Sequence, residues 1–334
     1  MEASKKSAKI IQPTIFNVEG PKERNTEQAK KPKAKKPKAK AKKPKAKAKK
    51  PKAKAKKPEK KNRVITVTFG DSGENHVGNQ QIGTKVSIGE GFTFEDFKKV
   101  EKKCNKLKIK CEIINLKSLL KKEHFDKAKT ENKVISDAYI ILIHDAVQTN
   151  PGEDADQIYE ELMGFEWDTK YYDSRRKKVL NKHARSNLCF DQADQEPDYE
   201  QGKGRIISWD RLPKLSKVKT FIAQLFGAKA RDMIGEGNNY SDRTKNGIGW
   251  HGDAERMKVI ALRINERNDE DETGTMVICW NWFHQSKPLG ETLRVEIPHG
   301  CIYAMSEKAT GFDWKYRSRY TLRHSAGANK YTKL

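Results

Sequence analysis

The chain has 334 residues and a formal net charge of +24 at pH 7. Its longest apolar run, residues 138–143, is far shorter than the ~20 residues of a membrane-spanning helix, so we expect neither a transmembrane span nor a secretory signal. Five scattered cysteines without C-x-x-C spacing argue against a disulfide framework and a structural zinc site, and favour a reducing compartment. We therefore predict an intracellular protein that does not bind membranes.

Most of the charge lies in one segment near the N-terminus. Residues 30–61 contain 19 lysines and one glutamate, a local charge of +18 that leaves +6 for the rest of the chain. Prolines recur every seven residues from Pro37 to Pro58, and no apolar side chain in this segment is larger than alanine. Repelling lysines and prolines disfavour helix, and no core offsets the ordering entropy. We therefore expect residues 1–62 to be a disordered tail rich in Lys, Pro and Ala.

This tail resembles the tails of linker histones. A flexible polycation binds the phosphates of nucleic acid through counterion release, without sequence preference. Its Lys-Lys-Pro-Lys runs also fit a nuclear localisation signal, which predicts the nucleus or another compartment that contains DNA. The alternatives are a solubilising tail or an anchor to a different polyanion.

Residues 63–150 are predicted to form a small α/β domain. Strands are expected at 64–69, 111–116 and 137–143, and helices at 92–107 and 117–129. Strands that alternate with helices indicate a partly parallel sheet. The polar stretch from Gly70 to His76 lacks the glycine spacing of phosphate-binding loops and is interpreted as an ordinary loop. The sequence does not indicate what this domain does.

The pattern changes near residue 150. Helices are expected at 155–163 and 213–226. The chain is then rich in strands, which we predict at 259–264, 276–283, 292–297, 301–305 and 316–324. Short strands without intervening helices indicate a β roll. The predicted fold class is therefore α+β, with a C-terminal all-β roll over residues 151–334.

The most informative stretch is residues 236–263, because it contains an H-x-D pair. In a strand, residues i and i+2 point to the same face, so His251 and Asp253 are expected to project together, with Glu255 one step further. One imidazole and one carboxylate are two of the three ligands of the facial triad that binds non-haem Fe(II) in oxygenases. His and Asp on a solvated strand face are the structural alternative.

Further motifs surround this pair in a recognisable order. Asn238 and Tyr240 precede it as N-x-Y, the H-x-D-x-E segment follows, and a Gly-hydrophobic-Met strand covers residues 300–305. The last predicted strand carries alternating polar residues, which are Arg317, Arg319, Thr321 and Arg323. Together these motifs make residues 151–334 similar to the AlkB family of Fe(II)/2-oxoglutarate dioxygenases.

The resemblance implies a double-stranded β-helix, or jelly-roll, that uses Fe(II), 2-oxoglutarate and O₂. It assigns catalytic roles to His251, Asp253 and Glu255. The residues that it implies for 2-oxoglutarate are Asn238, Tyr240, Arg317, Arg319, Thr321 and Arg323. Arg319 or Arg323 would pair with the distal carboxylate, because guanidinium binds carboxylate in a bidentate fashion. The residues implied for substrate binding are Lys182, His183, Arg185, Trp250 and Glu255.

The third iron ligand is where the chain departs from the family. The family has a histidine at the position where Lys315 stands, and a charged lysine is not a triad ligand. We predict that His324 is the third ligand, with His284 and His299 as weaker candidates. Strict alternation places Arg323 and His324 on opposite faces, so this assignment requires a bulge near residues 320–324.

These motifs predict an oxygenase that demethylates or hydroxylates alkylated or methylated bases in nucleic acid, as in DNA repair. Two alternatives stay open. One is a hydroxylase or demethylase of protein side chains, and the other is a nucleic-acid-binding module that has lost its iron site. Lys315 in place of the family's histidine is the feature that keeps the last alternative open.

Overall fold

The computed structural model describes residues 62–149, 154–266 and 275–334, and they all fall within one compact unit. The prediction of a disordered tail over residues 1–62 lies outside the described residues, except for Asn62. No helix among the described residues is long and apolar enough to cross a membrane.

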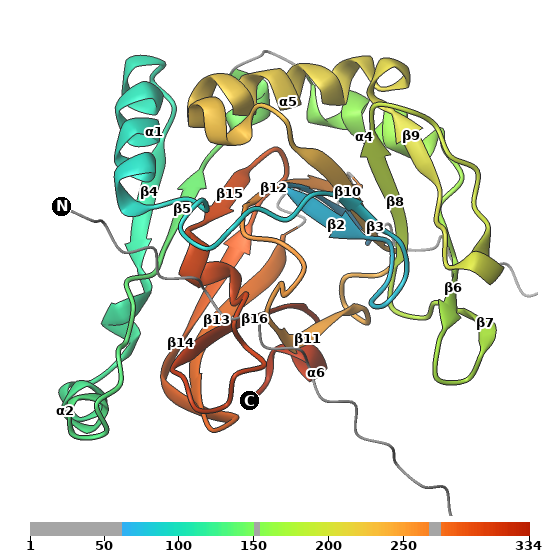
Figure 1. The fold of residues 1–334 in the computed structure, drawn as a ribbon. Coiled ribbons are helices and arrows are strands. Elements are labelled where there is room, and N and C mark those ends of the chain that lie inside the picture. Colours follow the sequence, from blue (N-terminus) through green and yellow to red (C-terminus); the bar gives the residue numbers. More distant parts are fainter. Residues whose placement is uncertain (1–61, 150–153, 267–274) are drawn as a thin grey trace, which may run out of the picture. The chain divides into compact units, whose positions relative to one another are not determined.

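The described residues form a mixed α+β fold that is dominated by two sheets (Figure 1). Across the large sheet the strands are β4 (Cys111–Asn115), β5 (Tyr139–Ile143), β15 (Ile302–Met305), β12 (Val259–Asn265), β1 (Val64–Gly70), β10 (Ile234–Tyr240), β8 (Ser186–Asp191) and β9 (Ile206–Ser208). Across the small sheet they are β11 (Gly247–His251), β16 (Thr321–Gly327), β13 (Met276–His284) and β14 (Lys287–Ile297). Two separate hairpins are β2–β3 (Ser72–Glu74, Gln81–Gly83) and β6–β7 (Lys170–Asp173, Lys178–Asn181).

Helices connect these strands. The α-helices are α1 (Phe94–Lys106), α2 (Lys122–Thr130), α3 (Ala146–Thr149), α4 (Ala155–Met163), α5 (Pro213–Phe226) and α6 (Asn329–Thr332). Short 3₁₀ helices cover Leu116–Leu119, Tyr199–Gln201, Trp209–Arg211, Gly227–Ala230 and Glu307–Thr310. The single helix predicted at 117–129 is thus divided into a 3₁₀ turn and α2, whereas α4 and α5 have the predicted bounds.

The small α/β domain predicted for residues 63–150 does not form a unit of its own. Its strand β1 lies between β10 and β12, and its strand β5 pairs with β15. The predicted parallel pairing is also wrong, because β4 and β5 are antiparallel and β8–β9 is the parallel pair among the described strands. A sheet of three strands would leave edges and faces uncovered, and joining the later strands covers them.

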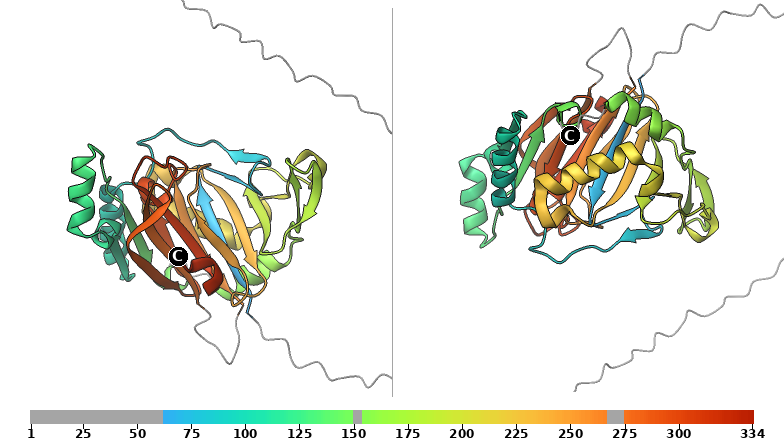
Figure 2. Two further views of the ribbon diagram at one scale, coloured as in Figure 1. Left: turned by 90° about the horizontal axis from the view of Figure 1, so that it is seen from below. Right: turned by 90° about the horizontal axis from the view of Figure 1, so that it is seen from above.

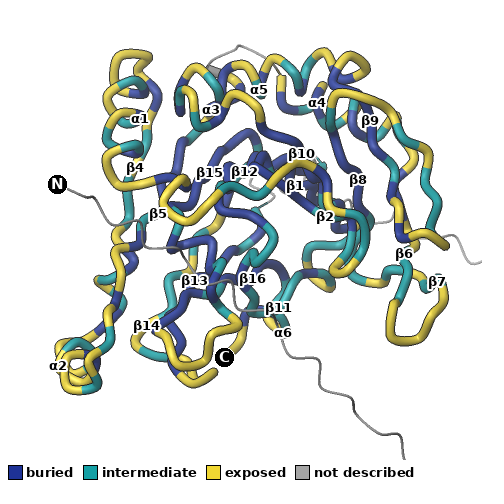
Figure 3. The backbone as a smooth tube through the Cα atoms, viewed as in Figure 1, coloured by how far each residue is buried: buried dark blue, intermediate teal, exposed yellow. Residues whose placement is uncertain are grey.

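The large sheet is the middle of three layers (Figure 2). Along β12, Ile260, Leu262 and Ile264 pack toward a core that contains residues of α1, α4 and α5. The alternate residues Val259 and Ala261 pack into a second core shared with the small sheet. This alternation follows from the period of two along a strand. Figure 3 shows that buried residues concentrate in the strands of the two sheets, while α2 and the hairpin tips are exposed.

Candidate metal centre

His251 and Asp253 come together as expected, although Asp253 lies beyond the end of the strand. β11 ends at His251, and two residues later the Asp253 amide donates to the Thr310 carbonyl at 2.9 Å. Gly252 packs so closely that an added Cβ would lie 2.2 Å from the Gly311 carbonyl oxygen. The position of the carboxylate therefore depends on contacts with the segment that precedes β16, in addition to the neighbouring strand.

His324 enters the same place from β16. It is paired directly with His251 across the β11–β16 ladder, and the register shift lies in this ladder between Ile248 and His251. The predicted bulge at residues 320–324 is absent, because β16 keeps a regular register with β13 from Thr321 to Ala326. Leu322 and Ala326 pack in the core between the sheets, so alternation points His324 inward and Arg323 outward.

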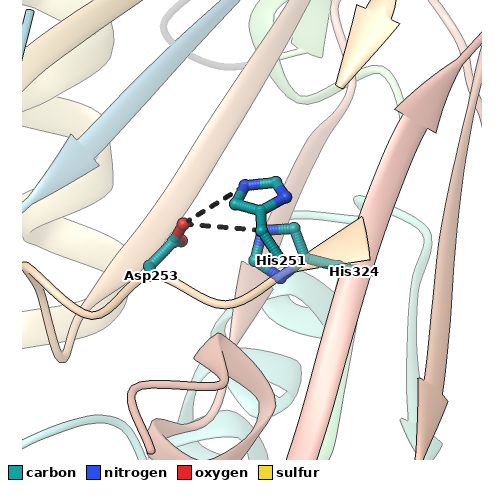
Figure 4. Close-up of side chains that lie close together, drawn as sticks. All are labelled: His251, Asp253 and His324. Atoms are coloured by element: carbon teal, nitrogen blue, oxygen red, sulfur yellow. Dashed lines mark ion pairs between the residues drawn. The ribbon is translucent and has the colours of Figure 1, made fainter. Parts of the chain in front are cut away.

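The three side chains form a compact group (Figure 4). One ligand atom from each of His251, Asp253 and His324 lies within 4.8 Å of the others. Asp253 Oδ1 lies 3.7 Å from His251 Nε2 and 3.5 Å from His324 Nε2. The two imidazole rings have centroids 4.4 Å apart at an angle of 61°. Two imidazoles and one carboxylate around one point can bind a divalent transition metal.

The protonation states suit metal binding. His251 Nδ1 donates to the Gly249 carbonyl at 2.7 Å, which leaves the lone pair on Nε2 free. Burial, followed by the charge of His324, lowers the pKa of His251 to about 3. Burial raises the pKa of Asp253, but the charge and hydrogen bond of His324 outweigh it and hold that pKa below its usual range. A neutral imidazole and an ionised carboxylate are the forms that coordinate metals.

The group lies at one end of a cavity of about 220 Å³ between the two sheets. Alternating residues of the large sheet line the opposite wall, and they include Thr66 of β1, Glu236, Asn238 and Tyr240 of β10, Arg263 of β12, and Tyr303 of β15. The cavity is thus lined with polar and ionisable groups in the centre of an otherwise apolar core.

Arg263 is one of several residues of this wall that were not predicted from the sequence, together with Thr66, Glu236 and Tyr303. It is 1% exposed, its guanidinium donates to the Thr66 hydroxyl at 2.6 Å, and its Nε has no hydrogen-bond partner among the described residues. Burial lowers its pKa, and no carboxylate opposes this effect. The signal was present in the sequence, since Arg263 is the one charged residue in the strand VIALRIN.

The arginines predicted to bind 2-oxoglutarate do not line the cavity. Arg317 and Arg319 are exposed in a turn before β16, because residues 315–319 have no buried side chain to anchor a strand. Arg323 lies outside the small sheet, with its guanidinium 4.3 Å from the ring centroid of Phe283. Thr321 occupies the same outward face two residues earlier. Of the predicted set, Asn238 and Tyr240 do line the cavity.

The residues predicted to bind substrate are divided in the same way. Arg185 and Glu255 line the cavity, whereas Lys182 is a structural link that donates to Asn187 at 2.9 Å. His183 is exposed and lies outside the lining. Trp250 points to the outer side of the small sheet, where its ring is 5.8 Å from that of Phe283. It does not lie in the cavity because alternation along β11 turns it away from His251.

Glu255 belongs to a buried charge network at the cavity. It accepts from Arg256 at 3.0 Å, and Arg256 also pairs with Glu236 of β10. Burial raises the pKa of Glu255. Glu74 and His76 also line the cavity, so the stretch after β1, predicted to be an ordinary loop, contributes to this site.

The other candidates for the third ligand lie elsewhere. Lys315 is exposed at the edge of the cavity, with its ammonium 6.0 Å from the Trp314 ring centroid. His284 stacks on Tyr320 at 4.4 Å, and His299 accepts from the Asn265 amide at 2.9 Å. Neither histidine lines the cavity.

Comparison with known proteins shows that the chain is similar to a viral protein. No family model matches it. It is 36% identical over 269 residues to the uncharacterized protein R156 of Acanthamoeba polyphaga mimivirus, an alignment that covers 80% of this chain and 97% of the viral protein. The chain therefore belongs to the same protein family as mimivirus R156.

Proposed function

We propose that the protein is an Fe(II)- and 2-oxoglutarate-dependent dioxygenase, similar to the AlkB family. One observation carries the proposal. The group of His251, Asp253 and His324 shares a cavity with Arg263, a buried guanidinium that has no carboxylate partner among the described residues. A divalent metal and a dicarboxylate would satisfy both ends of this cavity at once.

The donor set fits Fe(II). Two imidazoles and one ionised carboxylate match the 2-His-1-carboxylate set of non-haem iron oxygenases. The hydrogen bond from His251 Nδ1 to Gly249 fixes the ring so that Nε2 is the available ligand atom. Once bound, Fe(II) and 2-oxoglutarate supply the activation of O₂ for oxidation of a C–H bond.

The opposite wall fits one carboxylate of 2-oxoglutarate. A buried charge without a partner destabilises the folded protein by roughly several kcal/mol. A bound carboxylate offsets this destabilisation through charge-assisted hydrogen bonds. Arg263 is held by Thr66, and the hydroxyls of Tyr240 and Tyr303 line the same cavity. We assign the role expected of Arg319 or Arg323 to Arg263. Its strand lies in the sheet that faces the metal group, so the two ends of the cosubstrate would meet different walls.

The arrangement of the sheets supports a double-stranded β-helix. The small sheet packs against one face of the large sheet, and the cavity lies between them with lining residues from both. In such a fold, β strands hold the reactive group while the surrounding apolar core excludes water. Arg256 and Glu236 form a buried ion pair in the wall of the cavity. We assign contacts with the substrate to Glu255 and Arg185, which also line the cavity.

We propose a methylated or alkylated base of a nucleic acid as the substrate. The support is the charge of +18 over residues 30–61, which favours binding to phosphate backbones. Oxidation of an N-methyl group gives a hemiaminal that releases formaldehyde and restores the base. The same support favours a compartment that contains DNA.

The experiment measures succinate formed from 2-oxoglutarate under air, with Fe(II) and oligonucleotides that carry N-methylated bases. Wild type should form succinate and formaldehyde, and His251→Ala and Asp253→Ala should form neither, with Lys315→Ala as the active control. Wild-type turnover by Asp253→Ala would refute the metal assignment. Turnover with methylated peptides but not with oligonucleotides would assign a protein substrate. If wild type binds no Fe(II), the chain is a binding module.

A further inference from the structure

The positive charge of residues 62–334 is distributed unevenly along the chain. These residues carry +5, while residues 94–133 alone contain 13 lysines and seven acidic residues, a charge of +6. A second basic stretch, residues 170–185, also carries +6 and includes the β6–β7 hairpin. Everything else between residues 62 and 334 is therefore net negative.

Residues 94–133 form a continuous arm at one edge of the large sheet. Figure 1 shows α1, β4 and α2 in a column along this edge, and β4 is the terminal strand of the sheet. The cavity lies under β15, β12, β1 and β10, further into the sheet. The arm is thus outside the candidate metal centre and contributes no residue to it.

Most lysines of the arm are exposed, and eight of them have no ion pair among the described residues. Phe97, Val100 and Cys104 form the buried face of α1, so Lys99, Lys102 and Lys106 lie on its opposite face. The exposed lysines of the arm that have no ion pair among the described residues are Lys99, Lys102, Lys106, Lys108, Lys110, Lys121, Lys122 and Lys129. Repulsion within such a set opposes folding, and a bound polyanion relieves it.

We propose that this lysine arm, residues 94–133, is a binding surface for the phosphate backbone of a nucleic-acid duplex. The composition decides between partners. The exposed large apolar side chains of the arm are Phe94 and Leu107, which lie at opposite ends of α1 and so form no continuous apolar patch. This does not suit a protein interface or insertion into a membrane. The cations of the arm are all lysines, which bind phosphate as point charges. Lysines along the ~20 Å of α1 match a rigid and regular array of charges.

The arm gives the protein a second basic surface for nucleic acid, in addition to the lysine-rich sequence at residues 30–61. The inference goes beyond the proposed function, because it needs no metal and no turnover. It is therefore tested with the full chain in the presence of a chelator, so that failure of the iron assignment leaves the result intact.

The first measurement is the salt dependence of binding to a mixed-sequence DNA duplex. The variant Lys99→Gln/Lys102→Gln/Lys106→Gln should lower the slope of log K against log salt by about 2.7, since each neutralised phosphate contributes about 0.9. The matched control neutralises three exposed lysines outside both basic stretches, Lys287→Gln/Lys330→Gln/Lys333→Gln, and should keep the wild-type slope. Equal slopes for the two variants would overturn the proposal.

The second measurement uses the unaltered chain and does not depend on a variant that folds. Lysine acetylation with and without duplex is followed residue by residue by mass spectrometry. Lys99, Lys102 and Lys106 should be acetylated more slowly in the presence of duplex, and Lys287, Lys330 and Lys333 at an unchanged rate. Protection by anionic phospholipid vesicles but not by duplex would assign the arm to a membrane and refute the proposal.

Discussion

The two walls of the cavity solve the problem of buried charge in opposite ways. On the small-sheet side, Asp253 lies beside two imidazoles, with its Oδ1 3.7 Å from His251 Nε2 and 3.5 Å from His324 Nε2. On the large-sheet side, Arg263 is buried with a hydroxyl as its partner and no carboxylate. A metal alone would satisfy the groups of the first wall. On the second wall, the buried charge of Arg263 destabilises the folded protein until an anion binds. Loss of a residue of the metal group and loss of Arg263 should therefore change the free energy of unfolding with opposite sign.

The largest effect is expected from removal of a metal ligand. His324→Ala should weaken binding of Fe(II) or Co(II) by more than about 100-fold, because even residues that only support a ligand change affinity by 10–100-fold. Calorimetric titration under anaerobic conditions measures this. Lys315→Ala should bind metal as wild type does, and equal affinities of wild type and His324→Ala would show that another residue is the third ligand.

The opposite wall is tested by Arg263→Met. Affinity for 2-oxoglutarate should fall by roughly 10- to 100-fold, since hydrogen bonds to charged groups contribute ~1.5–3 kcal/mol. The free energy of unfolding without ligand should rise by ~1–4 kcal/mol, because an unpaired buried charge is replaced by an apolar side chain of similar length.

Arg323→Met is the matched control for this substitution. It removes a guanidinium that does not line the cavity and lies over the rings of Phe283 and Trp314, so 2-oxoglutarate affinity should not change. Stability should fall by ~0.5–2 kcal/mol through loss of the cation–π contacts. The assignment is wrong if Arg323→Met, and not Arg263→Met, loses the cosubstrate.

A smaller effect is expected at Gly252, the residue that precedes Asp253. Gly252→Ala places a Cβ 2.2 Å from the Gly311 oxygen, so the backbone beside Asp253 must shift. Metal affinity should fall by about 10-fold, which is the lower end of the range for a residue that supports a ligand. Gly249→Ala, where an added Cβ meets nothing within 4 Å, should bind metal normally. Similar metal affinities for Gly252→Ala and Gly249→Ala would show that a shift of the backbone at Gly252 does not disturb the metal group.

The smallest effect concerns pH. Burial, then the charges of Lys182 and Arg185, lower the pKa of His76 to about 4. The unfolded chain binds this proton below a pH of about 6.5 and the folded chain only near 4, so stability falls as pH drops between these values. His76→Gln should lose less stability than wild type between pH 7 and 4.5, by at most ~1 kcal/mol since the ring is partly exposed. Identical pH profiles in thermal unfolding would contradict this.

Several features could be predicted from local pattern. α4 and α5 begin and end at the expected residues, because their apolar positions recur with helical spacing. Val64–Gly70 and Tyr139–Ile143 are strands as expected. The convergence of His251, Asp253 and His324 was also expected, but the bulge predicted at residues 320–324 was wrong, since regular alternation along β16 turns His324 inward.

The arginine in the cavity could not be assigned by the same reasoning. Local alternation distinguishes Arg323 from His324, but it does not say which of them faces the core, and the resemblance to AlkB pointed to Arg319 or Arg323. Arg263 faces the cavity because β12 pairs with β1 on one side and β15 on the other, and these partners come from residues 64–70 and 302–305. Such pairing is a long-range event that no short pattern encodes.

Local sequence was enough for the bounds of α4 and α5, the alternation of the strands and the concentration of lysine at residues 30–61, because these depend on neighbours along the chain. Only the tertiary structure decided that residues 62–149 share a sheet with the later strands, and that a buried guanidinium faces the metal group. The physical reason is that strands pair wherever an edge and an apolar face remain uncovered, whatever their separation in sequence.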